Sequence, residues 1–188
     1  MPPAISSALI LALGALGLWA MWRGWQHRTR RTGVLVPALP AVPADGSADL
    51  GRPRTDPVEV TYVSTTVAGD WLDRVTAHGL GLRGPAVVQV FDGGVRILRP
   101  GATDLFIPAT ALRAAGTAPG IAGKVVGGDG IVLLTWCAPG EPAGEGTLLD
   151  TGLHTRHRAD RPRLVEAIAT LARVDDRAVT SHLQEEES

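Results

Sequence analysis

The longest hydrophobic pattern in the chain is an apolar run near its N-terminus. Residues 4–22 (AISSALILALGALGLWAMW) carry no charged side chain. At a helical rise of ~1.5 Å per residue, a run of about nineteen residues spans roughly 28 Å, close to the ~30 Å hydrocarbon core of a bilayer. The run therefore predicts one transmembrane helix embedded in the lipid bilayer. The side chains expected to anchor it are Leu9, Leu11, Leu13, Leu16, Leu18, Trp19 and Trp22.

Basic residues follow this run and none precedes it. They are Arg23, Arg28, Arg30 and Arg31. Because cytoplasmic flanks of membrane helices are enriched in Lys and Arg, the asymmetry predicts a single-pass plasma-membrane protein with its N-terminus outside and its C-terminal domain in the cytoplasm. Each arginine can also interact with anionic headgroups, at about 1 kcal/mol. The alternative, a cleaved signal peptide, needs a basic start, and the opening residues MPPA have none.

Two segments lack the pattern of a packed domain. Residues 23–57 contain these arginines followed by a proline-rich stretch. Because proline disfavours both helices and sheet ladders, an exposed tether is expected. Residues 175–188 are mostly acidic or polar and end in QEEES, which predicts a solvated, disordered tail. The remaining residues, 58–174, have the usual size of one domain.

Period-two alternation and turn residues dominate that domain. Residues 58–66 (VEVTYVSTT) are rich in β-branched side chains and predict a strand. Residues 70–78 (DWLDRVTAH) then predict a short helix with Trp71, Leu72 and Val75 on its apolar side.

A hairpin is predicted next, followed by more strands and a helix. Asp92 and Gly93 separate the apolar runs 86–91 and 95–99, and Asp-Gly between such runs is a strong hairpin signal. Asp160 is placed to begin a helix whose apolar residues recur at helical spacing. Further strands are predicted at 104–107, 112–116, 130–137 and 148–155.

About seven antiparallel strands capped by a C-terminal helix describe a PH-like barrel. The blocks YVSTTVAGDWLDRVTAHGLGLRG, IAGKVVGGDGIVLLTW and DTGL occur in order, and residues 58–174 with the anchor resemble the bacterial PH-like domain of small actinobacterial membrane proteins. The resemblance implies a mainly β, PH-like barrel carried on one transmembrane helix. Such proteins are often labelled membrane, export or transporter proteins and are commonly encoded among pyrimidine-biosynthesis genes. The resemblance implies no established activity.

Several motifs that carry chemistry elsewhere lack their structural context here. The glycines of GLGLRG (79–84) follow a predicted helix and precede a strand, the reverse of a dinucleotide-binding turn. His154 and His157 have no third ligand nearby, and the single cysteine excludes a multi-cysteine metal site. A net charge of −1 gives no overall electrostatic attraction to nucleic acid. No cofactor, metal site or catalytic group is therefore predicted.

Four residues of the domain are candidates for contact with a ligand or partner. Asp70 and Arg74 lie one helical turn apart in the predicted short helix and can pair with each other. His78 ends the same segment. Lys124 is the only lysine of the chain and stands in a glycine-rich loop, where it can meet an anionic group.

The function indicated is that of a membrane-anchored, non-enzymatic interaction module that binds an unidentified protein partner. The alternative is a role as an accessory to transport, or as a domain that binds a small anionic metabolite or lipid. One transmembrane helix cannot form a solute pathway by itself, so a transport role would require oligomers or a second protein.

Overall fold

The computed structural model describes residues 12–19, 21, 23, 36, 38–139 and 146–186 of the chain, with the side chains of the last helix described as far as Arg173. One antiparallel sheet has the strand order β4-β3-β2-β1-β9-β8-β5, and a small second sheet pairs β6 with β7. The strands are β1 (Val58–Val67), β2 (Gly84–Phe91), β3 (Gly94–Leu98), β4 (Leu105–Pro108), β5 (Leu112–Ala118), β6 (Gly120–Ile121), β7 (Lys124–Val125), β8 (Ile131–Cys137) and β9 (Leu148–Thr155).

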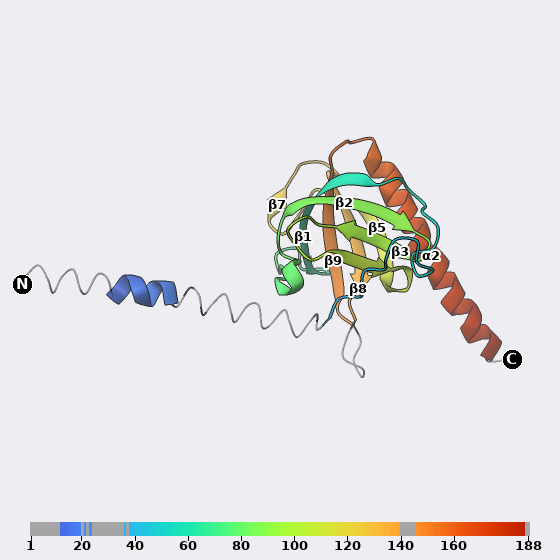
Figure 1. Cartoon of the computed structure of the whole chain (residues 1–188), viewed down its shortest axis with the longest axis horizontal. Coiled ribbons are helices and arrows are strands. Elements are labelled where there is room, and N and C mark those ends of the chain that lie inside the picture. The colour runs from blue at the N-terminus through green and yellow to red at the C-terminus, as the bar shows by residue number, and fades with distance from the viewer. Residues whose placement is uncertain are drawn as a thin grey trace, which may run out of the picture.

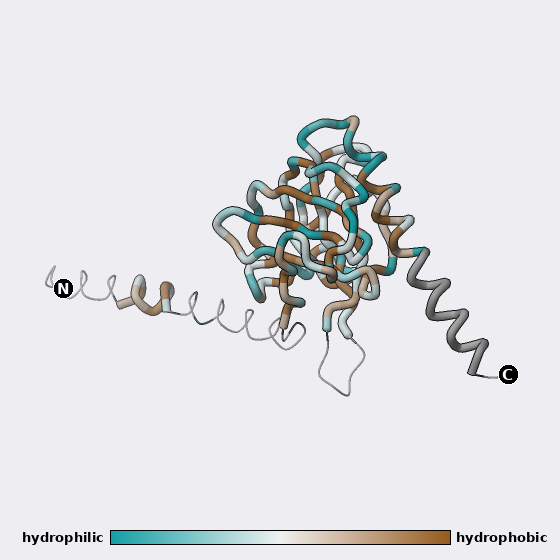
Figure 2. The backbone as a smooth tube through the Cα atoms, turned by 45° about the vertical axis from the view of Figure 1, so that its right-hand side comes forward, coloured by the Kyte–Doolittle hydropathy of each residue, from teal (hydrophilic) through white to brown (hydrophobic). Residues whose placement is uncertain are grey.

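The large sheet curls over itself to enclose the core. In Figure 1, β2 and β3 cross in front of β9 and β8, while α2 (Asp160–Glu186) runs along one side of the barrel. Hydrophobic residues are concentrated in the strands and in the first part of α2 (Figure 2). The main core includes Tyr62, Ile97, Leu134 and Trp136, and α2 contributes Leu164. A mainly β fold with seven strands in one antiparallel sheet and a C-terminal helix is thereby confirmed.

The local signals of the sequence located most strands and the start of the helix. The predicted hairpin forms, with Phe91 paired to Gly94 across the two-residue Asp92–Gly93 turn. The predicted helix begins at Asp160, and its apolar positions Leu164 and Ile168 are buried. The tail expected to be disordered is instead helical as far as Glu186. The sequence after Arg173 contains neither glycine nor proline and several good helix formers, so nothing there ends the helix.

The short helix predicted at residues 70–78 is wrong. The Asp70 carboxylate accepts hydrogen bonds from the N–H groups of Leu72 and Asp73, at 3.0 and 3.2 Å, and closes a turn. The chain then returns along β1, where the N–H of Val75 bonds to the carbonyl of Thr65 at 2.9 Å. Because β2 pairs with β1 only as far as Tyr62, the later part of β1 has a free edge that this segment satisfies.

A 3-10 turn, η1 (Ala77–Gly79), and a second one, η2 (Ala109–Ala111), complete the connections. His78 in η1 has a left-handed backbone with φ 52°, which no regular helix contains. The helical spacing of Trp71, Leu72 and Val75 predicted a common apolar face, and this prediction is wrong. Val75 is buried, but the side chains of Trp71 and Leu72 are exposed.

The proline-rich segment is not an exposed tether over residues 38–57. Val36 and Leu50 are buried, and Leu50 packs against Phe91 and Phe106 on the outside of the sheet. Asp92 in the hairpin turn accepts a hydrogen bond from the N–H of Arg52 at 3.3 Å. Proline excludes a regular ladder, but it leaves the apolar side chains between the prolines free to bury themselves on a neighbouring surface.

At the N-terminus, residues 12–19 are helical with Leu13, Leu16, Leu18 and Trp19 exposed, and the Arg23 guanidinium lies 5.4 Å from the centre of the Trp19 ring. Within the described part of the chain, no helix combines the length and the apolar character needed to cross a bilayer. The remaining predicted anchor and topology residues lie outside the described residues; they are Leu9, Leu11, Trp22, Arg28, Arg30 and Arg31.

Inside the barrel, a chain of hydrogen bonds connects β8, β9, β1 and the β1–β2 connection. The indole N–H of Trp136 donates to the Thr151 hydroxyl, at 2.9 Å. The Thr151 hydroxyl is 2.8 Å from that of Thr65, which in turn is 2.5 Å from the hydroxyl of Tyr62. The Tyr62 hydroxyl donates to the carbonyl of Leu80, at 3.0 Å. Indole only donates and a carbonyl only accepts, so all three hydroxyls must donate in the same direction, toward Leu80.

We predict that burial makes the Tyr62 hydroxyl resist ionisation. Burial raises the pKa of Tyr62 from 10.0 to about 12, although the Thr65 hydrogen bond and the nearby Arg99 charge favour the anion. Since the folded pKa exceeds the unfolded value, its contribution to stability is fully present below about pH 10 and is lost as the pH rises toward 12, by about 3 kcal/mol in total. Tyr62 is the only tyrosine in the chain, so tyrosinate absorbance reports on it alone. An apparent pKa near 10 in the folded protein would contradict this prediction.

A second, smaller core lies on the outer face of the sheet, beneath the β6–β7 hairpin. Ile121 of the hairpin packs on Val63 and Ile131. Close approach is possible because β9 has a glycine at this point: a Cβ atom added to Gly152 would lie 2.5 Å from a methyl carbon of Ile121. The absence of a side chain at Gly152 therefore determines how closely the hairpin packs.

Gly152→Ala is expected to displace the β6–β7 hairpin and to lower the free energy of unfolding by about 1–3 kcal/mol, as overpacking does. Chemical denaturation of the full chain in detergent measures this change. Gly116→Ala is the matched control, because that strand glycine has no atom within 4 Å of the added Cβ and no positive φ. Equal effects of the two substitutions would contradict the prediction.

Candidate functional site

The described residues do not form a recognisable catalytic or metal centre. Among them, no three or more His, Cys, Asp or Glu side chains are placed to hold a metal ion. Besides Tyr62, the only described group with a clearly displaced pKa is Asp92, where the hydrogen bond from Arg54 lowers the pKa of the carboxyl. Asp92 is exposed and joins the N-terminal segment to the hairpin turn, at 2.7 Å from Arg54, so its role is structural.

The candidates predicted from the sequence are brought together in part. Asp70 closes its own turn and makes no ion pair with Arg74. The Arg74 guanidinium instead donates to the carbonyl of Ala122, at 2.9 Å, in the loop that carries Lys124. His78 lies apart, with its Nε2 2.8 Å from the carbonyl of Val36, and since a carbonyl only accepts, this nitrogen carries the hydrogen.

The β1–β2 connection and the β6–β7 hairpin thus meet, and both carry exposed apolar side chains. The exposed fractions are 51 % for Trp71, 64 % for Leu72, 68 % for Val125 and 41 % for Val126. We refer to these four residues as the apolar tip. The loops are joined by the Arg74 bond and by a second one, from the N–H of Ala122 to the carbonyl of Trp71, at 2.8 Å.

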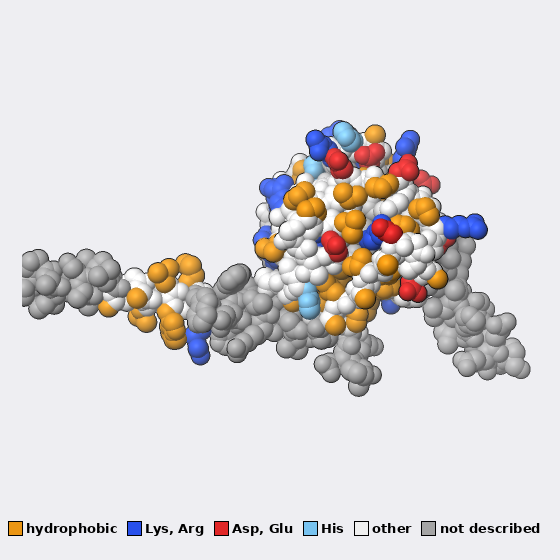
Figure 3. Space-filling model, in the orientation of Figure 1, with side chains coloured by type: hydrophobic (Ala, Val, Ile, Leu, Met, Phe, Trp, Pro, Cys, Tyr) orange, Lys and Arg blue, Asp and Glu red, His pale blue; other side chains and the backbone are white. Residues whose placement is uncertain are grey.

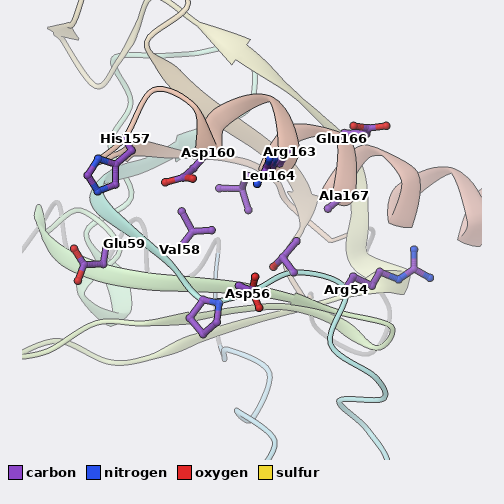
Figure 4. Close-up of a pocket in the computed structure, with 12 residues that line it drawn as sticks. Arg54, Asp56, Val58, Glu59, His157, Asp160, Arg163, Leu164, Glu166 and Ala167 are labelled. Atoms are coloured by element: carbon purple, nitrogen blue, oxygen red, sulfur yellow. The ribbon is translucent and has the colours of Figure 1, made fainter.

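A concave site lies between the first turns of α2 and the end of the N-terminal segment. This α2 groove has a volume of about 520 Å³. In Figure 4, the α2 residues lie along one wall and the segment from Arg54 to Glu59 along the other. The lining residues are Arg54, Thr55, Asp56, Pro57, Val58, Glu59, His157, Asp160, Arg163, Leu164, Glu166 and Ala167.

Charge in the α2 groove is predominantly negative. Two of its charged residues have partners outside it: Arg54 pairs with Asp92 at 2.7 Å, and Glu59 pairs with Arg156 at 3.0 Å. Asp56, Asp160 and Glu166 make no ion pair with any described residue, and Arg163 is the only other arginine in the lining. An apolar floor with an acidic rim can therefore receive apolar and basic groups together.

A second hollow, with a volume of about 830 Å³, lies on the outer face of β1, β2 and β9. It is lined by Arg83, His154 and Arg156 together with the apolar side chains of Pro85 and Val87. Charged side chains and histidines gather at the end of the molecule around the β9–α2 connection (Figure 3). His154 and His157 therefore line two different hollows and do not form a common site.

Neither surface is evident in the sequence alone. In the sequence, residues 54–57 are predicted as the end of a linker and residues 58–59 as the start of a strand, and only the packing of this stretch beside α2 creates the groove. The apolar tip was partly visible, since Trp71 and Leu72 stand out as apolar residues, but their assignment to a helix placed them on a buried face. Val125 and Val126 join them only because the β6–β7 hairpin contacts the β1–β2 connection.

Comparison with known families agrees with this architecture. The sequence model of the family described as Bacterial PH domain-like matches residues 36–169, which is well over half of the chain, so the protein belongs to the bacterial PH-like family. The match begins at Val36, whose side chain is fully buried. Among curated proteins, no match was found.

Proposed function

We propose that this protein is a membrane-anchored, non-enzymatic PH-like interaction module that binds a protein partner at the cytoplasmic face of the plasma membrane. The observation that carries the proposal is the α2 groove, a concave surface of about 520 Å³ on a domain whose described residues form no catalytic or metal constellation. Because the PH-like fold is compatible with many functions, the proposal depends on this site and not on the fold alone.

The partner segment that best complements the groove combines apolar and basic side chains. Val58 and Ala167 are half-buried and offer apolar surface, while Leu164, which also lines the groove, is fully buried. Asp56 and Glu166 are exposed carboxylates without ion-pair partners among the described residues. An amphipathic helix or an extended segment with Lys or Arg beside Leu or Val would contact both kinds of surface.

Membrane anchoring is supported by the sequence of the N-terminal region. The uncharged run 4–22 followed by Arg23, Arg28, Arg30 and Arg31 has the length and charge asymmetry of a single membrane helix with a cytoplasmic C-terminal side. The anchor would hold the groove close to membrane proteins and thereby raise the effective concentration of a partner there.

The test is site-specific photocrosslinking in the full chain, with a photoreactive residue in place of Ala167. We expect crosslinks to a partner segment rich in Lys or Arg, and we expect the double variant Asp56→Lys/Glu166→Lys to lose them by at least about tenfold, since like charges would replace complementary ones. Mass spectrometry of the crosslinked peptide identifies the segment.

The matched control for this experiment is Asp49→Lys, compared with the single groove variant Asp56→Lys. Each makes the same change of charge at one exposed carboxylate, and Asp49 lies outside the groove. Unchanged crosslinking in the groove variant, or equal loss in both variants, would refute binding through the groove. An acidic crosslinked segment would refute the chemistry assigned to the partner.

The second candidate function, binding of a small anionic metabolite or lipid as an accessory to transport, is favoured by the hollow that contains Arg83 and His154. Inorganic phosphate is the simplest probe. If this function is correct, phosphate raises the melting temperature of the full chain in detergent by mass action, and Arg83→Gln removes the shift. A shift that survives Arg83→Gln, or none at millimolar phosphate, would count against it.

A further inference from the structure

The apolar tip differs from the other exposed apolar residues of the domain because its members are grouped and protrude. All residues in 69–74 and 123–129 are exposed, so both loops project from the barrel. Leu98 and Leu148, by contrast, are single exposed leucines at strand ends. A projecting group of one Trp, one Leu and two Val residues has no concave surface to receive a partner, but it can itself enter an apolar environment.

Several backbone N–H groups of the tip loops already have hydrogen-bond acceptors within the protein. The N–H groups of Leu72 and Asp73 bond to the Asp70 carboxylate, and the N–H of Ala122 bonds to the carbonyl of Trp71. On the other loop, the N–H of Val126 bonds to the carbonyl of Pro119 at 3.0 Å. Internal satisfaction of backbone donors lowers the cost of placing these loops at the boundary of a bilayer.

The charged residues of the two loops are few and have no basic excess. Residues 69–74 and 123–129 carry three acids, Asp70, Asp73 and Asp129, against two bases, Arg74 and Lys124. Long basic side chains can extend from an apolar surface toward headgroups. Without a basic excess the loops have no net attraction to anionic lipid, so binding at the tip must come from its apolar side chains.

The path of the N-terminal segment puts the tip within reach of the predicted anchor. Val36 contacts His78 in the β1–β2 connection, the same connection that carries Trp71 and Leu72. Because residues 38–57 pack onto the domain, only residues 24–35 remain between Arg23 and Val36. Even fully extended, that segment reaches no more than about 43 Å at ~3.6 Å per residue. The domain must therefore stay near a bilayer that holds the anchor.

We propose that the apolar tip inserts into the interfacial layer of the membrane that holds the N-terminal anchor, and that this contact does not depend on headgroup charge. This inference rests on the anchoring part of the proposed function. The insertion would fix the orientation of the barrel on the membrane. Trp71 is well suited to the interface, where amphipathic aromatic rings are enriched.

The experiment uses the full chain reconstituted into vesicles, with an environment-sensitive fluorophore on a single cysteine. In a Cys137→Ala background, which removes the only native cysteine, the label is placed by Leu72→Cys, by Val125→Cys or, as a control, by Thr117→Cys on an exposed position of β5. The vesicles contain phosphatidylcholine alone or an equimolar mixture with phosphatidylglycerol, each with and without brominated acyl chains.

Labels at Leu72 and Val125 are expected to emit at shorter wavelength and to be quenched by brominated lipid equally in both compositions, while the Thr117 label is not quenched. Trp71→Ser should reduce the quenching of the Val125 label at least twofold, whereas Leu98→Ser, which removes an exposed leucine elsewhere, should leave it unchanged. Quenching only in anionic vesicles would overturn the proposal in favour of headgroup electrostatics.

Extraction of the same vesicles at alkaline pH separates failure of the tip from failure of the anchor. If the chain stays with the lipid while both tip labels remain unquenched, insertion of the tip is refuted and the anchor stands, which would indicate a protein contact for the tip. If the chain is released, the anchor is refuted, and the inference about the tip falls with it.

Discussion

The directed hydrogen-bond chain inside the barrel is the interaction on which the described surfaces depend most. It begins at the indole of Trp136 on β8, passes through three hydroxyls, and ends at the carbonyl of Leu80 in the β1–β2 connection. Burial makes each of these groups costly to leave unpaired, so the connection is held against the sheet at one position. The loop that carries Trp71 and Leu72 begins and ends on that fixed framework, since Val75 also bonds to β1.

The N-terminal segment extends the barrel and creates the groove. Leu50 is buried against aromatic side chains of β2 and β4, and Arg54 is held by Asp92 in the hairpin turn. These contacts bring the stretch ending at Glu59 alongside α2, where neither element alone would form a concave surface. The same packing leaves only residues 24–35 between Arg23 and Val36, so one structural feature forms the groove and, if the proposed anchor holds Arg23 at a bilayer, limits the distance between the domain and that bilayer.

The groove and the apolar tip have different chemistry and can act together. The groove combines apolar surface with carboxylates, such as those of Asp56 and Glu166, that pair with no described residue, and this chemistry complements a basic protein segment. The tip carries exposed apolar side chains on loops without a basic excess, which suits the boundary of a bilayer without requiring anionic lipid. Under the two proposals, a domain oriented by the tip would present the groove to partners at a defined height above the membrane.

The sequence by itself determined the elements whose signals are local. The Asp92–Gly93 turn, the strand at 148–155 and the start of α2 at Asp160 follow from turn chemistry, period-two alternation and capping, all set within a few residues. Only the tertiary structure decided the course of residues 70–78 and the packing of residues 38–57, because both depend on surfaces supplied by distant residues: the free edge of β1 and the outer face of the sheet. The groove and the tip each combine segments distant in sequence, so no local pattern could reveal them.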